Sequence, residues 1–80
     1  MYFKQADLGK RVAELRRTNH MTQEDLAEKA EVNKLHISRI ERGITACSID
    51  LLLEMAEALQ VSTDFLLQAK TQKERLHERN

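Results

Sequence analysis

Residues 23–42 read QEDLAEKAEVNKLHISRIER, and this stretch decides the fold. Its apolar side chains fall at helical spacing in two short groups, made of Leu26, Ala27, Ala30, Val32, Ile37 and Ile40. A tight turn near Glu31 and Val32 separates the groups, so the stretch predicts a helix-turn-helix. Such a unit holds its second helix against the major groove of DNA, which makes DNA binding the first hypothesis.

The flanking sequence predicts three more helices, and the expected fold class is therefore all-α with five helices. The helices should run from about 6 to 19, from after Thr22, from after Asn33 to Gly43, from after Ser48 to about 60, and from after Ser62. The polar residues before four of them can cap free amides, and Gly43 can close the third helix in a left-handed conformation. The stripes expected to face inward outside the central stretch are Leu8, Val12 and Leu15, then Leu52, Met55, Ala56 and Leu59, then Phe65, Leu66 and Ala69.

Length and composition predict one small domain over residues 1–69, with a polar tail over 70–80 that extends the last helix or frays. The chain has no proline and two glycines, which favours helices joined by short turns. A single cysteine, Cys47, excludes an internal disulfide and fits a reducing cytoplasm. No apolar run approaches the ~20 residues that span a membrane, and no signal peptide is recognisable. We expect a cytoplasmic protein without membrane contact.

Charge is unevenly distributed along the chain, although the net charge is zero. The neutral total by itself argues against a nucleic-acid partner. Residues 1–22, however, hold five basic and two acidic side chains, whereas residues 43–69 hold no basic and four acidic ones. One end of the fold should therefore be positive and the other negative. The alternative is ordinary surface charge without a binding role.

Four segments, LGKRVAELRR, MTQEDLAEKA, ISRIERG and LLLEMAEALQVSTDFLL, resemble the DNA-binding domains of the lambda repressor/Cro-like (XRE-type) helix-turn-helix family. They lie between residues 8 and 67, in the order of that family. The resemblance implies five helices, a transcription regulator or repressor that binds double-stranded DNA, and a symmetric dimer on a palindromic operator. The sequence departs from the family at Glu31, where the family favours glycine. A left-handed glutamate there would cost about 1 kcal/mol.

The outward face of the third helix is the candidate surface for reading DNA bases. By resemblance, the base-facing residues are Lys34, Leu35, Ser38 and Arg39. Lysine or arginine can donate to guanine O6 and N7, and Leu35 can touch a thymine methyl group. The alternatives are a solvated helix face for the basic residues and packing against the second helix for Leu35.

Contacts to the DNA backbone are assigned on the same resemblance. The residues expected to meet phosphate are Gln23, Asn33, Arg42, Thr45 and Arg17. Gln23 opens the second helix, whose free amides and positive dipole end favour an anion. The alternative for Gln23 is a plain polar residue in a first helical turn. The loop GITACS at residues 43–48 has no basic side chain, so we expect Arg17 and Arg11 to compensate for a weaker contact there.

Arg16 and Glu41 occupy positions that form an ion pair between the first and third helices in similar proteins, and we assign them a structural role. The residues His20, His36, Cys47 and His77 share no metal-ligand spacing. The sequence also has no glycine-rich phosphate loop and no nucleophile motif. We therefore expect no metal, no cofactor, no small-molecule substrate and no enzymatic activity.

An apolar surplus in the acidic half suggests a partner. The run 51–53, Leu-Leu-Leu, cannot face one core, because a helix turns about 100° per residue. A homodimer through this half is one use for the surplus, and it would place two reading helices about 34 Å apart. Scattered exposed apolar residues are the alternative. The rival function is a protein-interaction module of the same fold, such as an antirepressor or antitoxin subunit, which the zero net charge favours.

Overall fold

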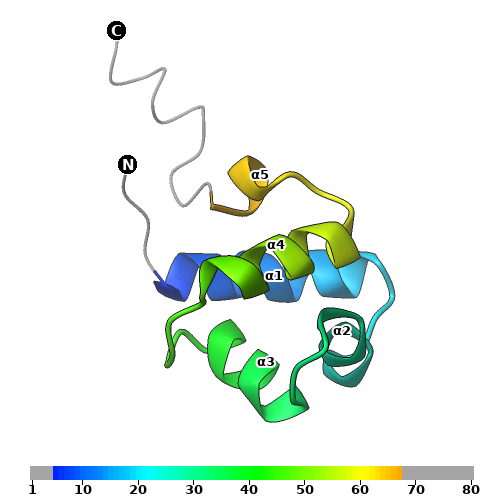
Figure 1. The fold of residues 1–80 in the computed structure, drawn as a ribbon, viewed down its shortest axis with the longest axis horizontal. Coiled ribbons are helices and arrows are strands. Elements are labelled where there is room, and N and C mark those ends of the chain that lie inside the picture. Colours follow the sequence, from blue (N-terminus) through cyan, green and yellow to red (C-terminus); the bar gives the residue numbers. More distant parts are fainter. Residues whose placement is uncertain (1–4, 68–80) are drawn as a thin grey trace, which may run out of the picture.

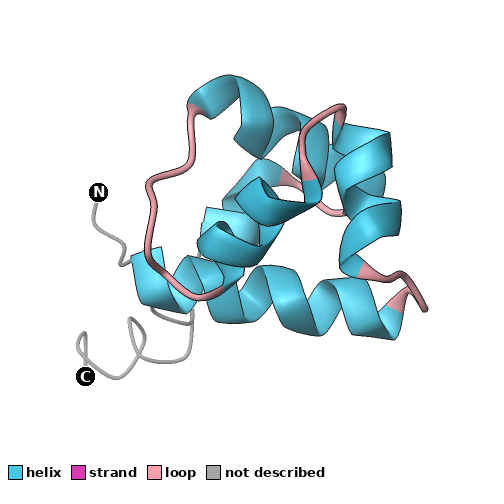
Figure 2. Cartoon of the chain, turned by 90° about the horizontal axis from the view of Figure 1, so that it is seen from below, coloured by secondary structure: helices cyan, strands magenta, loops and turns pink. Residues whose placement is uncertain are grey.

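The computed structural model describes residues 5–67 of the chain. This part folds into five helices, which confirms the predicted all-α class, and the observed ends lie within two residues of the expected ones (Figure 1). In chain order the helices are α1 (Gln5–Thr18), α2 (Gln23–Ala30), α3 (Lys34–Glu41), α4 (Ile49–Leu59) and α5 (Thr63–Leu67). Figure 2 shows short loops between them, and the longest loop within the described residues, 42–48, joins α3 to α4.

The helices surround one core. α1 packs against α3 and α5, while α2 packs against α3 and α4. In Figure 1, α2 and α3 lie on one side of α1 and α4, and α5 lies on the other side. The helix-turn-helix pair therefore forms one end of the described part of the molecule, away from α5.

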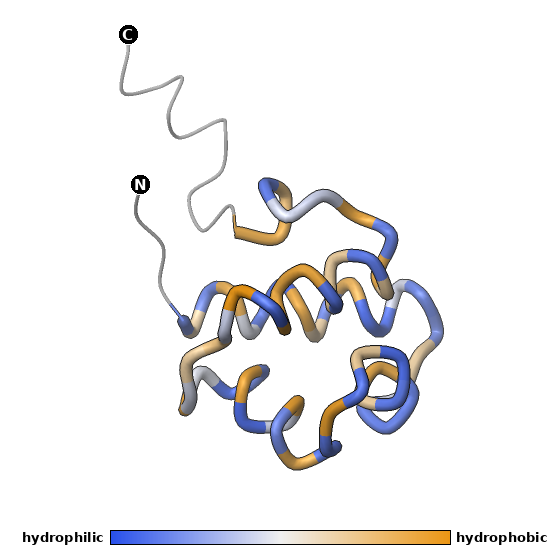
Figure 3. Tube along the Cα trace, viewed as in Figure 1, coloured by the Kyte–Doolittle hydropathy of each residue, from blue (hydrophilic) through white to orange (hydrophobic). Residues whose placement is uncertain are grey.

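Apolar side chains of α1 to α5 fill the space between the helices. Figure 3 shows polar and apolar positions alternating along the helical segments, as expected for helices with one buried face. In the central stretch the buried residues are Leu26, Ala27, Ala30, Ile37 and Ile40, with Leu26 and Ile37 fully excluded from solvent, whereas Val32 is only partly buried against the core. The larger core also contains Leu8, Val12, Leu51, Leu52, Met55, Ala56, Leu59 and Leu66.

One inward prediction was wrong. Phe65 is 46% exposed, whereas its neighbour Leu66 is fully buried. Phe65 lies about 100° around the helix from Leu66, and the five-residue α5 has one buried residue, Leu66. The expectation that 51–53 cannot all face the core was confirmed, since Leu53 is 53% exposed. Ala69 and the tail 70–80 lie outside the described residues.

Local hydrogen bonds fix where α2 and α3 begin. The Thr22 hydroxyl accepts a hydrogen bond from the Asp25 backbone N–H at 3.0 Å, and the Thr22 N–H donates to Asp25 Oδ2 at 2.9 Å, which completes a capping box. Asn33 caps α3, because its Oδ1 accepts from the Leu35 N–H at 2.7 Å. Between the two helices Glu31 is left-handed, with φ 59° and ψ 44°. This left-handed backbone is the conformation that glycine adopts most easily, which gives a physical reason for the family's preference for glycine at this turn.

Candidate nucleic-acid interface

α3 has one buried and one accessible face. Ile37 and Ile40 anchor the helix in the core, with 0% and 1% of their surfaces exposed. The predicted base-facing residues lie on the other side, where Lys34, Leu35 and Arg39 are exposed and Ser38 is half-buried. Leu35 is 50% exposed, so half of its surface is not used by the fold of residues 5–67.

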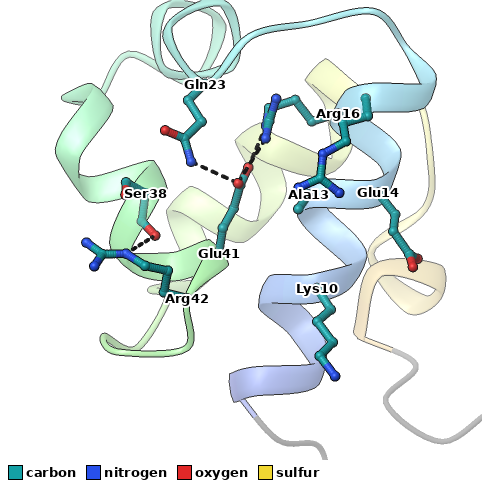
Figure 4. Close-up of a pocket in the computed structure, with 9 residues that line it drawn as sticks. Lys10, Ala13, Glu14, Arg16, Gln23, Ser38, Glu41 and Arg42 are labelled. Carbon is teal, nitrogen blue, oxygen red and sulfur yellow. Dashed lines mark hydrogen bonds and ion pairs between the residues drawn. The ribbon is translucent and has the colours of Figure 1, made fainter.

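A groove of about 350 Å³ lies between α1 and α3, beside the start of α2 (Figure 4). It is lined by Lys10, Ala13, Glu14, Arg16, Arg17, Gln23, Ser38, Glu41 and Arg42. The groove brings together four predicted DNA contacts from separate elements, namely Gln23, Ser38, Arg17 and Arg42. Cations outnumber carboxylates in this lining by four to two, which suits an anionic ligand.

Lys10 is a member of the groove that the sequence prediction missed. It is exposed on α1 and lies two helical turns before Arg17, so both side chains are on the same face of the helix. The seven-residue spacing of two basic residues on a helix with a buried opposite face was a usable signal. The groove itself depends on how α1 crosses α3, which the sequence alone did not provide.

A cluster of partly buried polar side chains lines one wall of the groove. Arg16 Nε donates to Glu41 Oε2 at 2.7 Å, and Arg16 Nη2 donates to Glu41 Oε1 at 3.1 Å. Arg16 Nη1 donates to the Met21 carbonyl at 2.9 Å, and Gln23 Nε2 donates to Glu41 Oε1 at 3.0 Å. The paired side chains are 11% and 6% exposed for Arg16 and Glu41. This cluster connects α1, the loop before α2, α2 itself and α3.

Arg42 lines the groove, whereas Asn33, Thr45 and Arg11 do not. Arg42 is exposed, and its Nε donates to the Ser38 carbonyl at 3.4 Å. The Asn33 side-chain oxygen is occupied by its capping bond. Thr45 is half-buried in the loop 42–48 and does not line the groove. Arg11 is half-buried on α1, and its Nε is buried without a hydrogen-bond partner among residues 5–67.

Two side chains have shifted pKa values. The backbone N–H of Thr22, followed by its hydroxyl, lowers the pKa of Asp25, because hydrogen bonds stabilise the carboxylate. Burial raises the pKa of the Cys47 thiol to about 11, so this cysteine is protonated near neutral pH.

Within residues 5–67, no three histidine, cysteine or acidic side chains converge as a metal site would require. In the same part of the chain, every helix is too short or too polar to pass through a lipid bilayer.

Solved structures share this arrangement of helices. The P22 c2 repressor, crystallised with a synthetic operator, is 32% identical and superposes with a TM-score of 0.74 over 79% of this chain and 96% of that one. The restriction-modification controller protein C.AhdI from Aeromonas hydrophila is 29% identical, with a TM-score of 0.76 over 78% of this chain and 94% of that one.

Curated sequences give the same relationship. The chain is 38% identical over 60 residues to the HTH-type transcriptional regulator ImmR of Bacillus subtilis, which covers 75% of this chain and 47% of ImmR. It is 39% identical over 51 residues to an uncharacterized HTH-type transcriptional regulator of Mycobacterium tuberculosis, covering 64% of this chain and 36% of that protein. The chain thus spans less than half the length of these relatives. Because the helix-turn-helix family model matches residues 12–66, the chain belongs to the helix-turn-helix family of lambda repressor/Cro-like (XRE-type) proteins.

Proposed function

We propose that this chain is a sequence-specific DNA-binding transcriptional regulator that acts as a repressor and reads the major groove with α3. The observation that carries the proposal is the two-sided character of α3, which is locked into the core by Ile37 and Ile40 while Lys34, Leu35 and Arg39 stay accessible. Membership of the family, the relatives described as regulators, and the operator-bound P22 c2 repressor support it. The same proposal assigns the protein to the cytoplasm.

Base reading is assigned to the first two turns of α3. Lys34 and Arg39 can donate to guanine O6 and N7, and Ser38 can bond either edge of a base. Leu35 is half-exposed in a helix that already has a well-buried face, so it suits an apolar contact with a thymine methyl group.

Backbone binding is assigned to the groove between α1 and α3. Gln23 stands at the start of α2, where free backbone N–H groups and the helix dipole favour a phosphate. Arg17 and Arg42 supply positive charge from two sides of the groove. This arrangement supports the expected compensation by α1 for a loop, 43–48, that has no basic side chain.

Binding measured against salt concentration tests the proposal. Gln23→Ala should weaken binding on all sequences, because it removes a phosphate contact, while Arg17→Ala should also lower the slope of log affinity against log salt by about 0.9. Arg39→Ala should relax the preference between bases. Lys29→Ala, which removes an exposed charge outside the groove, is the matched control. Absence of DNA binding, together with capture of a protein ligand, would favour the interaction-module function instead.

We further propose that two copies associate through the acidic half of the chain. Ile49 and Leu53 lie one helical turn apart on α4 and are 74% and 53% exposed, and Phe65 of α5 is 46% exposed. Residues 5–67 leave these apolar side chains exposed, and exposed apolar surface favours an interface. A symmetric pair would also match a palindromic operator.

Sedimentation tests the association. Leu53→Glu should convert a dimer into a monomer, because it places a charge in the apolar contact. Leu35→Glu makes the same chemical change at a leucine of similar exposure on α3, and it should leave the mass unchanged. If the natural protein sediments as a monomer at every concentration, or if both variants behave alike, this interface is wrong.

A further inference from the structure

The contact between Glu41 and Gln23 fixes the orientation of the Gln23 side-chain amide. A carboxylate accepts hydrogen bonds and cannot donate them, so Gln23 must turn its NH₂ group, and not its carbonyl oxygen, toward Glu41. The observed bond runs from Gln23 Nε2 to Glu41 Oε1 at 3.0 Å. It uses one N–H of the amide and leaves the second N–H for another acceptor. Figure 4 shows this amide at the edge of the groove, beside the ion pair.

The ion pair with Arg16 explains how a carboxylate, Glu41, can lie close to a proposed phosphate site. A free carboxylate next to a DNA phosphate would repel it. Two guanidinium nitrogens of Arg16 instead hold Glu41, at 2.7 and 3.1 Å, and only 6% of the glutamate side chain is exposed. Arg16 itself is held by the Met21 carbonyl. Glu41 is therefore an acceptor whose charge is neutralised by Arg16.

We infer that Glu41 is a positioning residue for DNA binding, which acts through Gln23. It holds the amide so that the second N–H faces a phosphate at the start of α2. Without this support Gln23 would sample several rotamers, and binding would have to order it. That loss of rotamer freedom corresponds to about twofold to tenfold in affinity. The inference rests on the proposed function and gives the ion pair a role beyond linking α1 to α3.

A double-mutant cycle separates positioning from mere stabilisation. Arg16→Met with Glu41→Met replaces the ion pair by apolar side chains, which avoids leaving one charge unpaired. In the natural background Gln23→Ala should weaken DNA binding about threefold to tenfold. In the Met/Met background the same Gln23→Ala change should weaken it less than twofold, because the amide is already free. An equal loss in both backgrounds would overturn the inference.

A stability control accompanies the cycle. Ser62→Ala removes the cap of α5, where the Ser62 hydroxyl accepts from the Phe65 N–H at 3.0 Å, on the side of the molecule away from α3. This variant should melt at a lower temperature and still show the full Gln23→Ala effect. If it also abolishes that effect, the coupling reflects general loss of stability and the inference fails.

Side-chain NMR relaxation of the natural protein tests the same point without a variant. The Gln23 amide should be as rigid as the backbone, whereas the amides of Gln5 and Gln60, which are exposed, should be mobile on the ps–ns timescale. Equal mobility of all three amides would overturn the inference. These outcomes can be told apart from a failure of the proposed function. If the protein binds DNA but Gln23→Ala has the same effect in both backgrounds, only the positioning role of Glu41 is refuted. If the protein does not bind DNA at all, the proposed function as a regulator is refuted.

Discussion

The backbone of α1 at Gly9 lies directly against the backbone of α3 at Ile40. A Cβ atom added at Gly9 would collide with the Ile40 carbonyl and would lie 2.6 Å from the Glu41 carbonyl oxygen. Backbone atoms cannot move aside as the end of a flexible side chain can. This close crossing sets the distance between α1 and α3, and with it the width of the groove and the position of α3.

Gly9→Ala should therefore destabilise the fold, although alanine is the better helix former. The gain in helix propensity is about 1 kcal/mol, whereas forcing two helices apart costs typically about 1–3 kcal/mol and displaces α3. We expect a lower melting temperature and weaker DNA binding. Glu14→Ala, an exposed change on the same helix, is the control for thermal melting. A Gly9→Ala protein that melts at or above the temperature of the natural one would refute the close crossing.

Glu31→Gly should raise stability without weakening DNA binding. The left-handed backbone at Glu31, with φ 59°, costs a side-chain-bearing residue about 1 kcal/mol that glycine does not lose. Glu28→Gly makes the same replacement within α2, where it should lower stability by about 1 kcal/mol. Thermal unfolding of both variants checks the sign. A fall in melting temperature for Glu31→Gly would contradict the left-handed turn.

The sequence predicted the helices well because their signals are local. Thr22, Asn33 and Ser48 are strong N-caps, and each one caps a helix as expected. Left-handed helix ends were harder to find, because the expected marker is glycine. His20 and Gln60 have φ values of 59° and 61° without being glycine. Phe65 was misplaced because a five-residue helix is too short for a stripe to define its inner face.

The candidate site was only partly predictable for a related reason. Residues such as Lys34 and Arg39 follow from their place in one motif, so the sequence could indicate them. Lys10 and the contact between Gln23 and Glu41 depend on how three helices cross. The isolated Gly9 inside a helical pattern is an available signal for that crossing, since glycine costs a helix about 1 kcal/mol relative to alanine and lets another backbone approach closely.

Glu41→Ala should destabilise the protein by about 1–3 kcal/mol, because it leaves Arg16 largely buried without its counter-ion. The Arg16→Met and Glu41→Met pair should cost less than this single change, since no unpaired charge remains. Chemical denaturation of the three proteins measures the difference. If the double variant is less stable than Glu41→Ala, the ion pair makes a net contribution to the free energy of unfolding beyond the mutual neutralisation of its two charges, and this explanation is wrong.

Asp25 should make stability depend on pH in the acid range. Its pKa in the folded protein lies below the ordinary value of 3.8, so the ionised form stabilises the fold. This stabilisation is complete above the unfolded-state pKa and is lost as the pH falls toward the folded-state pKa. The difference in melting temperature between the natural protein and Asp25→Asn should be constant from about pH 5 to 8 and should shrink below about pH 4. A difference that grows on acidification would contradict the capping interaction.

The decisive experiment is the selection of bound oligonucleotides from a random pool. We expect enrichment of a palindromic sequence whose half-sites are about one helical turn of DNA apart, with altered base preference for the Arg39→Ala protein. Recovery of the unselected pool by the natural protein, or the same enriched sequence for both proteins, would contradict the assignment of α3 as the helix that reads DNA.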